Sequence, residues 1–212
     1  HSLDPARPIM VNYRTGEINK FMAKLPELPG QIISCDQYPL GNFQYPGSVM
    51  DCARLIAKME KKLAPSGKGV WNWFQIAGNA FMNSREPTPA EYELMLYSSL
   101  IKGCRGFITF QNQSFSAQLW QTVGRIGYEF QALAPVIYAE ETPLPGCSAP
   151  EILMLPRKYN QDHYLICVNT SSAPVTARFD LPDNAEVVFE GRTLSQPSDY
   201  FAPYQRHVYR WR

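Results

Sequence analysis

Polar side chains that can bind hydroxyls or move protons follow four short apolar runs of the chain. They are Asn12 and Tyr13, Asp36 and Tyr38, Gln75, and Gln111 with Asn112. A carboxylate such as Asp36 can act as an acid or a base, and amide and phenol groups hydrogen-bond hydroxyl-bearing ligands. Three His and five dispersed Cys show no metal-ligand spacing, so we expect no metal site and no cofactor.

The runs that carry these residues are typical of buried parallel strands. We expect strands over 8–13, 31–36, 70–76 and 106–111, and helices over 48–63, 89–102 and 118–133. Thr88 and Glu91 predict a capping box for the second helix, and the third helix should end near Pro135. Alternating strands and helices indicate βα units with right-handed crossovers, whose functional groups lie at the carboxyl ends of the strands.

The character of the sequence changes after residue 142. Short apolar runs over 152–155, 164–168, 175–179, 185–189 and 207–211 are separated by turn residues, with no helical pattern between them. This pattern predicts a small antiparallel sandwich or open barrel. We therefore expect two domains, a βα domain over 1–142 and a β-sandwich domain over 143–212.

Four βα units are half of a closed (β/α) barrel, which has eight strands and about 250 residues. Four strands alone would leave edge strands and one face of the sheet open to water. Three arrangements would resolve this. A preceding half-barrel completes the sheet, a second copy pairs with it as a homodimer, or the strands form an open doubly wound sheet with helices on both faces.

Several short motifs occur in the order found in the second half of glycoside hydrolase barrels. They are Leu3-Asp4-Pro5-Ala6-Arg7-Pro8, Asp36-Gln37-Tyr38-Pro39, Val70-Trp71 through Gln75, Arg85-Glu86-Pro87-Thr88 with Glu91, and Gly103-Cys104-Arg105-Gly106. The chain resembles this superfamily over nearly its whole length, including a C-terminal β domain. The resemblance implies that the fold is half of a TIM barrel, strands five to eight, followed by an antiparallel sandwich.

The resemblance also implies a carbohydrate ligand and roles for the polar residues. Glycoside hydrolysis usually needs two carboxylates, and Asp36 would be the acid/base with its partner on the other half. Where many relatives have a nucleophilic Glu at the end of strand seven, this chain has Gln75. Asn12, Tyr13, Tyr38, Gln75, Gln111 and Asn112 would contact substrate. The alternatives are that Asp36 only contacts ligand or orders a loop, and that Gln75 is a satisfied polar group.

Two functions follow from this resemblance. The chain is a glycoside hydrolase-like protein that is incomplete by itself, or it is a non-catalytic carbohydrate-binding or scaffolding protein with a degenerate barrel site. An open α/β domain unrelated to sugars, held as a homodimer, is a third possibility.

The composition of the chain bears on which classes of partner it can bind. With 20 basic and 19 acidic residues the formal net charge is +1, which does not favour a nucleic-acid partner. No stretch reaches the roughly 20 apolar residues of a membrane span, and the resemblance implies a secreted or periplasmic location.

Overall fold

A computed structural model describes residues 7–41, 47–76, 78, 85–110 and 116–212. Gln111 and Asn112, two of the expected ligand-binding residues, lie outside the described residues. The chain divides into two compact units, one of residues 1–87 with 102–115 and one of residues 88–101 with 116–212. These limits differ from the boundary expected at residue 142, which stays a prediction. Among the described residues, no helix has the length and apolar character needed to cross a membrane.

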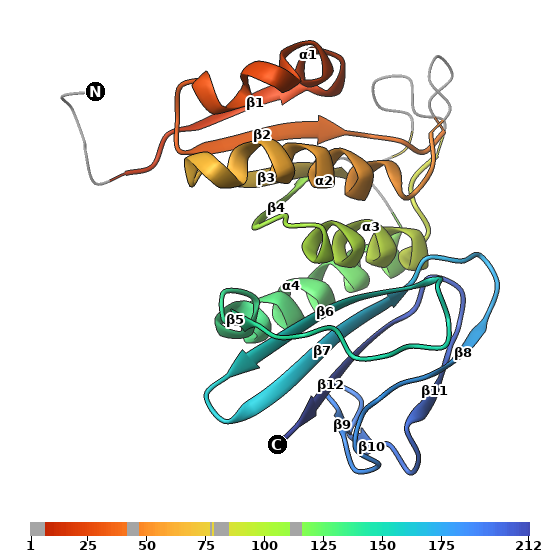
Figure 1. The fold of residues 1–212 in the computed structure, drawn as a ribbon. Coiled ribbons are helices and arrows are strands. Elements are labelled where there is room, and N and C mark those ends of the chain that lie inside the picture. Colours follow the sequence, from red (N-terminus) through yellow and green to blue (C-terminus); the bar gives the residue numbers. More distant parts are fainter. Residues whose placement is uncertain (1–6, 42–46, 77, 79–84, 111–115) are drawn as a thin grey trace. The chain divides into compact units, whose positions relative to one another are not determined.

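The first unit contains a sheet of four parallel strands. They are β1 (Met10–Arg14), β2 (Ile32–Gln37), β3 (Gly69–Gln75) and β4 (Gly106–Phe110), and they lie in the order β1-β2-β3-β4 (Figure 1). The four expected strands are therefore confirmed. The consecutive order differs from that of a doubly wound sheet, whose order reverses at a switch point.

The crossovers β1–β2 and β2–β3 place helices on one face of this sheet. They are α1 (Thr15–Phe21) with the 3-10 helix η1 (Met22–Glu27), and α2 (Asp51–Leu63) with η2 (Ala64–Ser66). Within this unit, η1 packs against α2, and α2 packs against β3.

Cys35, Cys52 and Asn72 are buried together on this covered face, where the Cys35 thiol donates to Asn72 Oδ1 at 3.0 Å. Burial raises the pKa of Cys35 and Cys52, so both are packed, unreactive thiols. All five cysteines of the chain are free thiols, and four of them are buried.

Side-chain alternation assigns the other residues of the strands to the opposite face. The register places Asn12 beside Ser34 and Trp71, and Arg14 beside Asp36 and Trp73. Trp71 and Trp73 thus share one face and Asn72 points to the other. Gly106 is required beside Trp71 on β4, because a Cβ at this position would overlap the indole ring.

The second unit begins with two helices, α3 (Pro89–Ile101) and α4 (Ala117–Ile137). The capping box of α3 is confirmed, since Thr88 N donates to Glu91 Oε2 at 2.8 Å and Glu91 N donates to Thr88 Oγ1 at 3.2 Å. The expected end of α4 near Pro135 is confirmed, since this helix ends at Ile137, two residues further on. Pro135 lacks a main-chain N–H and so removes one hydrogen bond to the preceding turn, and the helix ends within one turn after it.

The remaining strands of this unit are antiparallel. A six-stranded sheet has the order β10-β9-β12-β7-β6-β5, and a two-stranded sheet pairs β11 with β8. Their bounds are β5 (Glu140–Glu141), β6 (Ile152–Tyr159), β7 (Asp162–Asn169), β8 (Val175–Arg178), β9 (Glu186–Val187), β10 (Arg192–Thr193), β11 (Ser198–Phe201) and β12 (Arg206–Trp211). Leu165 and Tyr209 from the larger sheet pack with Ala177 and Phe201 from the smaller one in a shared core. The expected antiparallel β domain is confirmed.

A buried ion network joins α3 and α4 to β12 within the second unit. Glu129 on α4 pairs with Arg206 on β12, and both side chains are buried. Tyr97 of α3 donates to Glu129 Oε2 at 2.6 Å, and Arg125 donates to Glu129 Oε1 at 2.9 Å. Burial raises the pKa of Glu129, but the hydrogen bonds and positive charges around it lower the pKa by more, so this carboxylate is ionised at neutral pH.

Replacing the buried cation tests this network. Arg206→Ala should lower the free energy of unfolding by about 3–5 kcal/mol, because it leaves a buried carboxylate without its main partner. Arg210→Ala on the same strand is the control, since the ion pair of Arg210 with Glu186 is exposed and such pairs contribute about 0–1 kcal/mol. Urea unfolding followed by circular dichroism measures both, and equal losses would contradict the prediction.

Candidate functional site at the carboxyl edge of the parallel sheet

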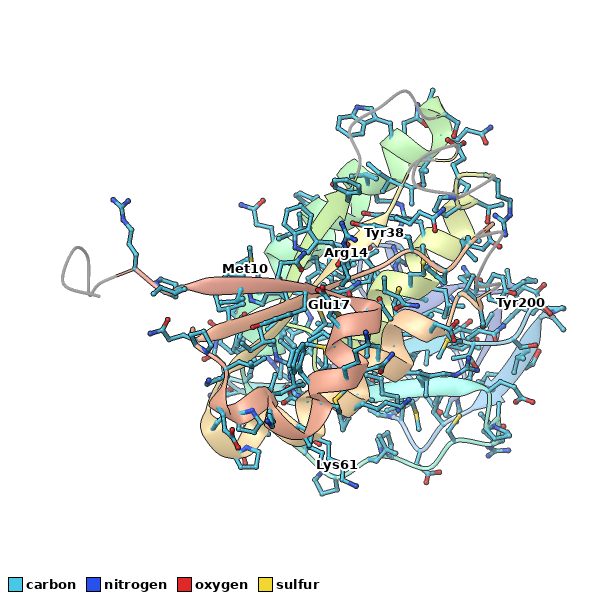
Figure 2. All side chains as sticks on the ribbon, turned by 90° about the horizontal axis from the view of Figure 1, so that it is seen from above. Met10, Arg14, Glu17, Tyr38, Lys61 and Tyr200 are labelled. Carbon is cyan, nitrogen blue, oxygen red and sulfur yellow. The ribbon has the colours of Figure 1, made fainter. Side chains whose placement is uncertain are left out.

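The carboxyl ends of β1 to β4 bring several of the expected residues to one edge. Asn12 and Asp36 lie on the opposite face, and Gln75 ends β3 on the same face. Tyr38 follows β2 directly. In Figure 2, Met10 and Arg14 mark the two ends of β1 and so identify the carboxyl end of that strand.

The Asp36 carboxyl group at the end of β2 is half-buried, and its surroundings change its pKa. Burial raises its pKa above the ordinary value, and the charge of Glu17 adds to this, whereas the charge of Arg14 and a side-chain hydrogen bond from Asn12 act in the other direction. Among the described residues, none is a hydrogen-bond partner of Asp36 Oδ1, although this oxygen is buried. A half-buried carboxyl with a raised pKa at the end of a parallel strand is typical of a functional acid.

Three aromatic rings lie beside this carboxyl group. Tyr38 and Phe110 are stacked with their centroids 5.4 Å apart and their planes 13° apart, and Trp73 meets Phe110 edge-on at 6.1 Å. Burial, followed by the charge of Asp36, raises the pKa of Tyr38, so its phenol stays protonated. The rings give the site an apolar wall, which suits the C–H face of a sugar.

Gln75 is held by the main chain of two loops. Its Oε1 accepts from Leu40 N at 3.0 Å, and its Nε2 donates to Leu40 O and to Arg85 O, each at 3.0 Å. The side chain is only 2% exposed. These bonds use both amide hydrogens, so the amide positions the segments after β2 and β3. Its contact with a sugar stays a prediction.

The structure does not bring Tyr13 to the site. Tyr13 lies on the covered face, where its ring packs against Phe21 of α1 at 6.4 Å, because it alternates with Asn12 along β1. Sequence reasoning missed Arg14 and Glu17, which act on Asp36 through their charges, and it did not place Phe110 and Trp73 beside Tyr38. Alternation along β1 could have identified Arg14, since Arg14 and Asn12 are two residues apart and must share a face. Among the described residues, no group of three His, Cys, Asp or Glu side chains could hold a metal ion.

Solved glycoside hydrolases share this fold. The α-amylase from Geobacillus thermoleovorans, solved with acarbose, matches with a TM-score of 0.56 and 10% identity, over 95% of this chain and 60% of that one. Amy13B of Eubacterium rectale matches with a TM-score of 0.51 and 8% identity, over 96% and 60%. The noncanonic maltogenic α-amylase AmyB from Thermotoga neapolitana also gives a TM-score of 0.51 and 8% identity, over 99% and 56%.

These likenesses define a class of fold. The expected resemblance to glycoside hydrolases is confirmed at that level, as a parallel βα sheet followed by an antiparallel β domain. The chain spans no more than 60% of the length of the three α-amylases it matches. No protein-family model matches the sequence. No curated protein matches it either.

The role of Gln75 as an amide can be tested by charge. Gln75→Glu should lower the free energy of unfolding by about 2–4 kcal/mol at pH 7, because a carboxylate would face the Leu40 and Arg85 carbonyl oxygens that the amide now satisfies. Gln37→Glu is the matched control, since Gln37 Oε1 accepts from Thr15 Oγ1 and a carboxylate can do the same. Chemical denaturation of both variants decides the question, and a fully stable Gln75→Glu protein would refute this role.

The raised pKa of Asp36 predicts a stability effect that depends on pH. Because the folded protein favours the neutral form, the ionised carboxylate costs stability once the pH rises above the ordinary value of 3.8 and through the folded pKa. Asp36→Asn should therefore raise the melting temperature at pH 7 by about 1–2 °C, allowing for solvent screening, and should change it little at pH 3. Differential scanning calorimetry measures this, with Asp183→Asn in an exposed turn as the control. A lower melting temperature for Asp36→Asn at pH 7 would assign Asp36 a structural role.

Proposed function

We propose that this chain is the second half of a glycoside hydrolase-type (β/α) barrel, strands five to eight, and that it binds carbohydrate at the carboxyl edge of β1 to β4. Asp36 acts there as the acid/base, and the chain completes its site with a preceding half-barrel. The observation that carries the proposal is the Asp36 carboxyl group, which has a raised pKa and a buried oxygen at the end of β2. The consecutive strand order and the likeness to α-amylases support the barrel arrangement.

Hydrolysis needs a second carboxylate, about 5–10 Å from the first. Of the described residues that form the carboxyl ends of the four strands, Asp36 is the one with a carboxylate. The amide of Gln75 is engaged with the main chain and is not nucleophilic. The acid/base role of Asp36 therefore requires a partner carboxylate from the other half of the barrel.

The same observation favours a second candidate, a non-catalytic carbohydrate-binding protein with a degenerate barrel site. Recognition of a sugar needs hydrogen bonds and an apolar wall, which Asn12, Asp36, Tyr38 and Phe110 provide, and it does not need a second acid. The two candidates share a binding site and differ in turnover when a complete barrel is present.

Calorimetric titration with maltotriose, cellotriose, xylotriose and mannotriose tests the shared claim. We expect at least one trisaccharide to bind with a dissociation constant of about 0.1–1 mM, a modest affinity for a half-open site. Product analysis of the same mixtures should show no hydrolysis, because a single carboxyl group lacks its partner. Absence of binding to all four sugars would overturn the proposed function, and hydrolysis at an ordinary enzymatic rate would show that no second half is needed.

A further inference from the structure

Two buried polar atoms on neighbouring strands of the opposite face lack hydrogen-bond partners among the described residues. They are Asp36 Oδ1 on β2 and Trp73 Nε1 on β3. The two residues are register partners, and their side chains lie on the same face of the sheet. Native proteins leave few buried polar atoms unpaired, so two of them on register-paired residues require an explanation.

The two atoms have complementary chemistry. A carboxylate oxygen only accepts hydrogen bonds, and an indole Nε1–H only donates. Although their residues are adjacent in register, they do not bond to each other. A single group that satisfies both atoms must donate to Asp36 Oδ1 and accept from Trp73 Nε1. A hydroxyl group does both with a single oxygen atom. An ammonium group only donates, so it cannot accept from Trp73 Nε1. A phosphate or carboxylate group accepts but cannot donate to Asp36 Oδ1.

The surroundings favour a hydroxyl that belongs to a sugar. Trp73 meets Phe110 edge-on and Phe110 stacks on Tyr38, so an apolar wall stands beside the pair. Asn12 and Arg14 act on the same carboxyl group from β1. A sugar ring has an apolar C–H face that can pack on the aromatic rings and hydroxyl groups that can bond to Asp36 and Trp73.

We propose that Asp36 and Trp73 form a hydroxyl-recognition pair, in which one sugar hydroxyl donates to Asp36 Oδ1 and accepts from Trp73 Nε1. The inference rests on the proposed carbohydrate function and adds Trp73 as a specificity-determining residue. It assigns Trp73 a role through its indole nitrogen, beyond the packing of its ring.

Trp73→Phe tests the pair, because it removes the donor and retains an aromatic ring. With the trisaccharide of the four that binds wild type most tightly as the probe, calorimetry should show about 3–10-fold weaker binding for Trp73→Phe. Asp36→Asn should weaken binding by about 10-fold or more, since a charged acceptor is lost. The double variant should lose less than the product of the two factors, because both single variants break contacts with the same hydroxyl.

Trp71→Phe is the matched control, because Trp71 lies two residues before Trp73 on β3 and on the same face of the sheet. This substitution should leave the affinity within about twofold of the wild-type value. Melting temperatures of all variants establish that they are folded. If the trisaccharide binds and Trp73→Phe binds it as tightly as wild type, the pair holds an ordered water only and the inference falls, whereas the proposed function stands. If none of the four sugars binds wild type, the proposed function fails first and the inference with it.

Discussion

Side-chain alternation along four parallel strands separates the residues of the first unit into two chemical environments. Ile33, Val70 and Phe74 are buried on the face that carries α1 and α2, where close packing excludes charge. The opposite face carries the guanidinium of Arg14 and the carboxyl group of Asp36. A shift of one residue in the register would exchange the two sets. The site therefore exists only because the parallel register is fixed, and apolar burial on the covered face fixes it.

Asp36 and Gln75 lie at neighbouring strand ends but differ in burial and in hydrogen bonding. Gln75 is buried, and its amide donates to the main-chain carbonyl oxygens of Leu40 and Arg85. These hydrogen bonds stabilise the loops after β2 and β3. Asp36 is half-buried, has a raised pKa and leaves one oxygen unpaired among the described residues, so it costs stability. Polar groups that cost stability are retained most readily where a ligand compensates them. This contrast separates a structural residue from a candidate functional one at neighbouring strand ends.

The sequence was informative wherever local pattern decides structure. The strands of the first unit followed from apolar runs between Gly and Pro, and the capping box at Thr88 and Glu91 followed from two residue types at a fixed spacing. The sequence was least informative about contacts between distant residues. The ion pair of Glu129 with Arg206 joins positions 77 residues apart, and no local sequence pattern predicts it. Tyr13 is next to Asn12 along the chain, but side-chain alternation along β1 places it on the covered face, away from Asn12 and Asp36.

Recognition and cleavage of a sugar make unequal demands on such a site. Recognition needs a donor, an acceptor and an apolar wall, and a single sheet edge with Asp36, Trp73 and Phe110 has all three. Cleavage needs a second carboxylate at a set distance across the scissile bond, and among the described residues at the carboxyl ends of β1 to β4 the one carboxylate is Asp36. Loss of the second carboxylate therefore abolishes turnover, whereas the proposed binding at Asp36 and Trp73 does not depend on it. Asp36 with a raised pKa and an amide at the end of β3 therefore fit the proposed arrangement, in which these four strands recognise the sugar and a second acid comes from the other half of the barrel.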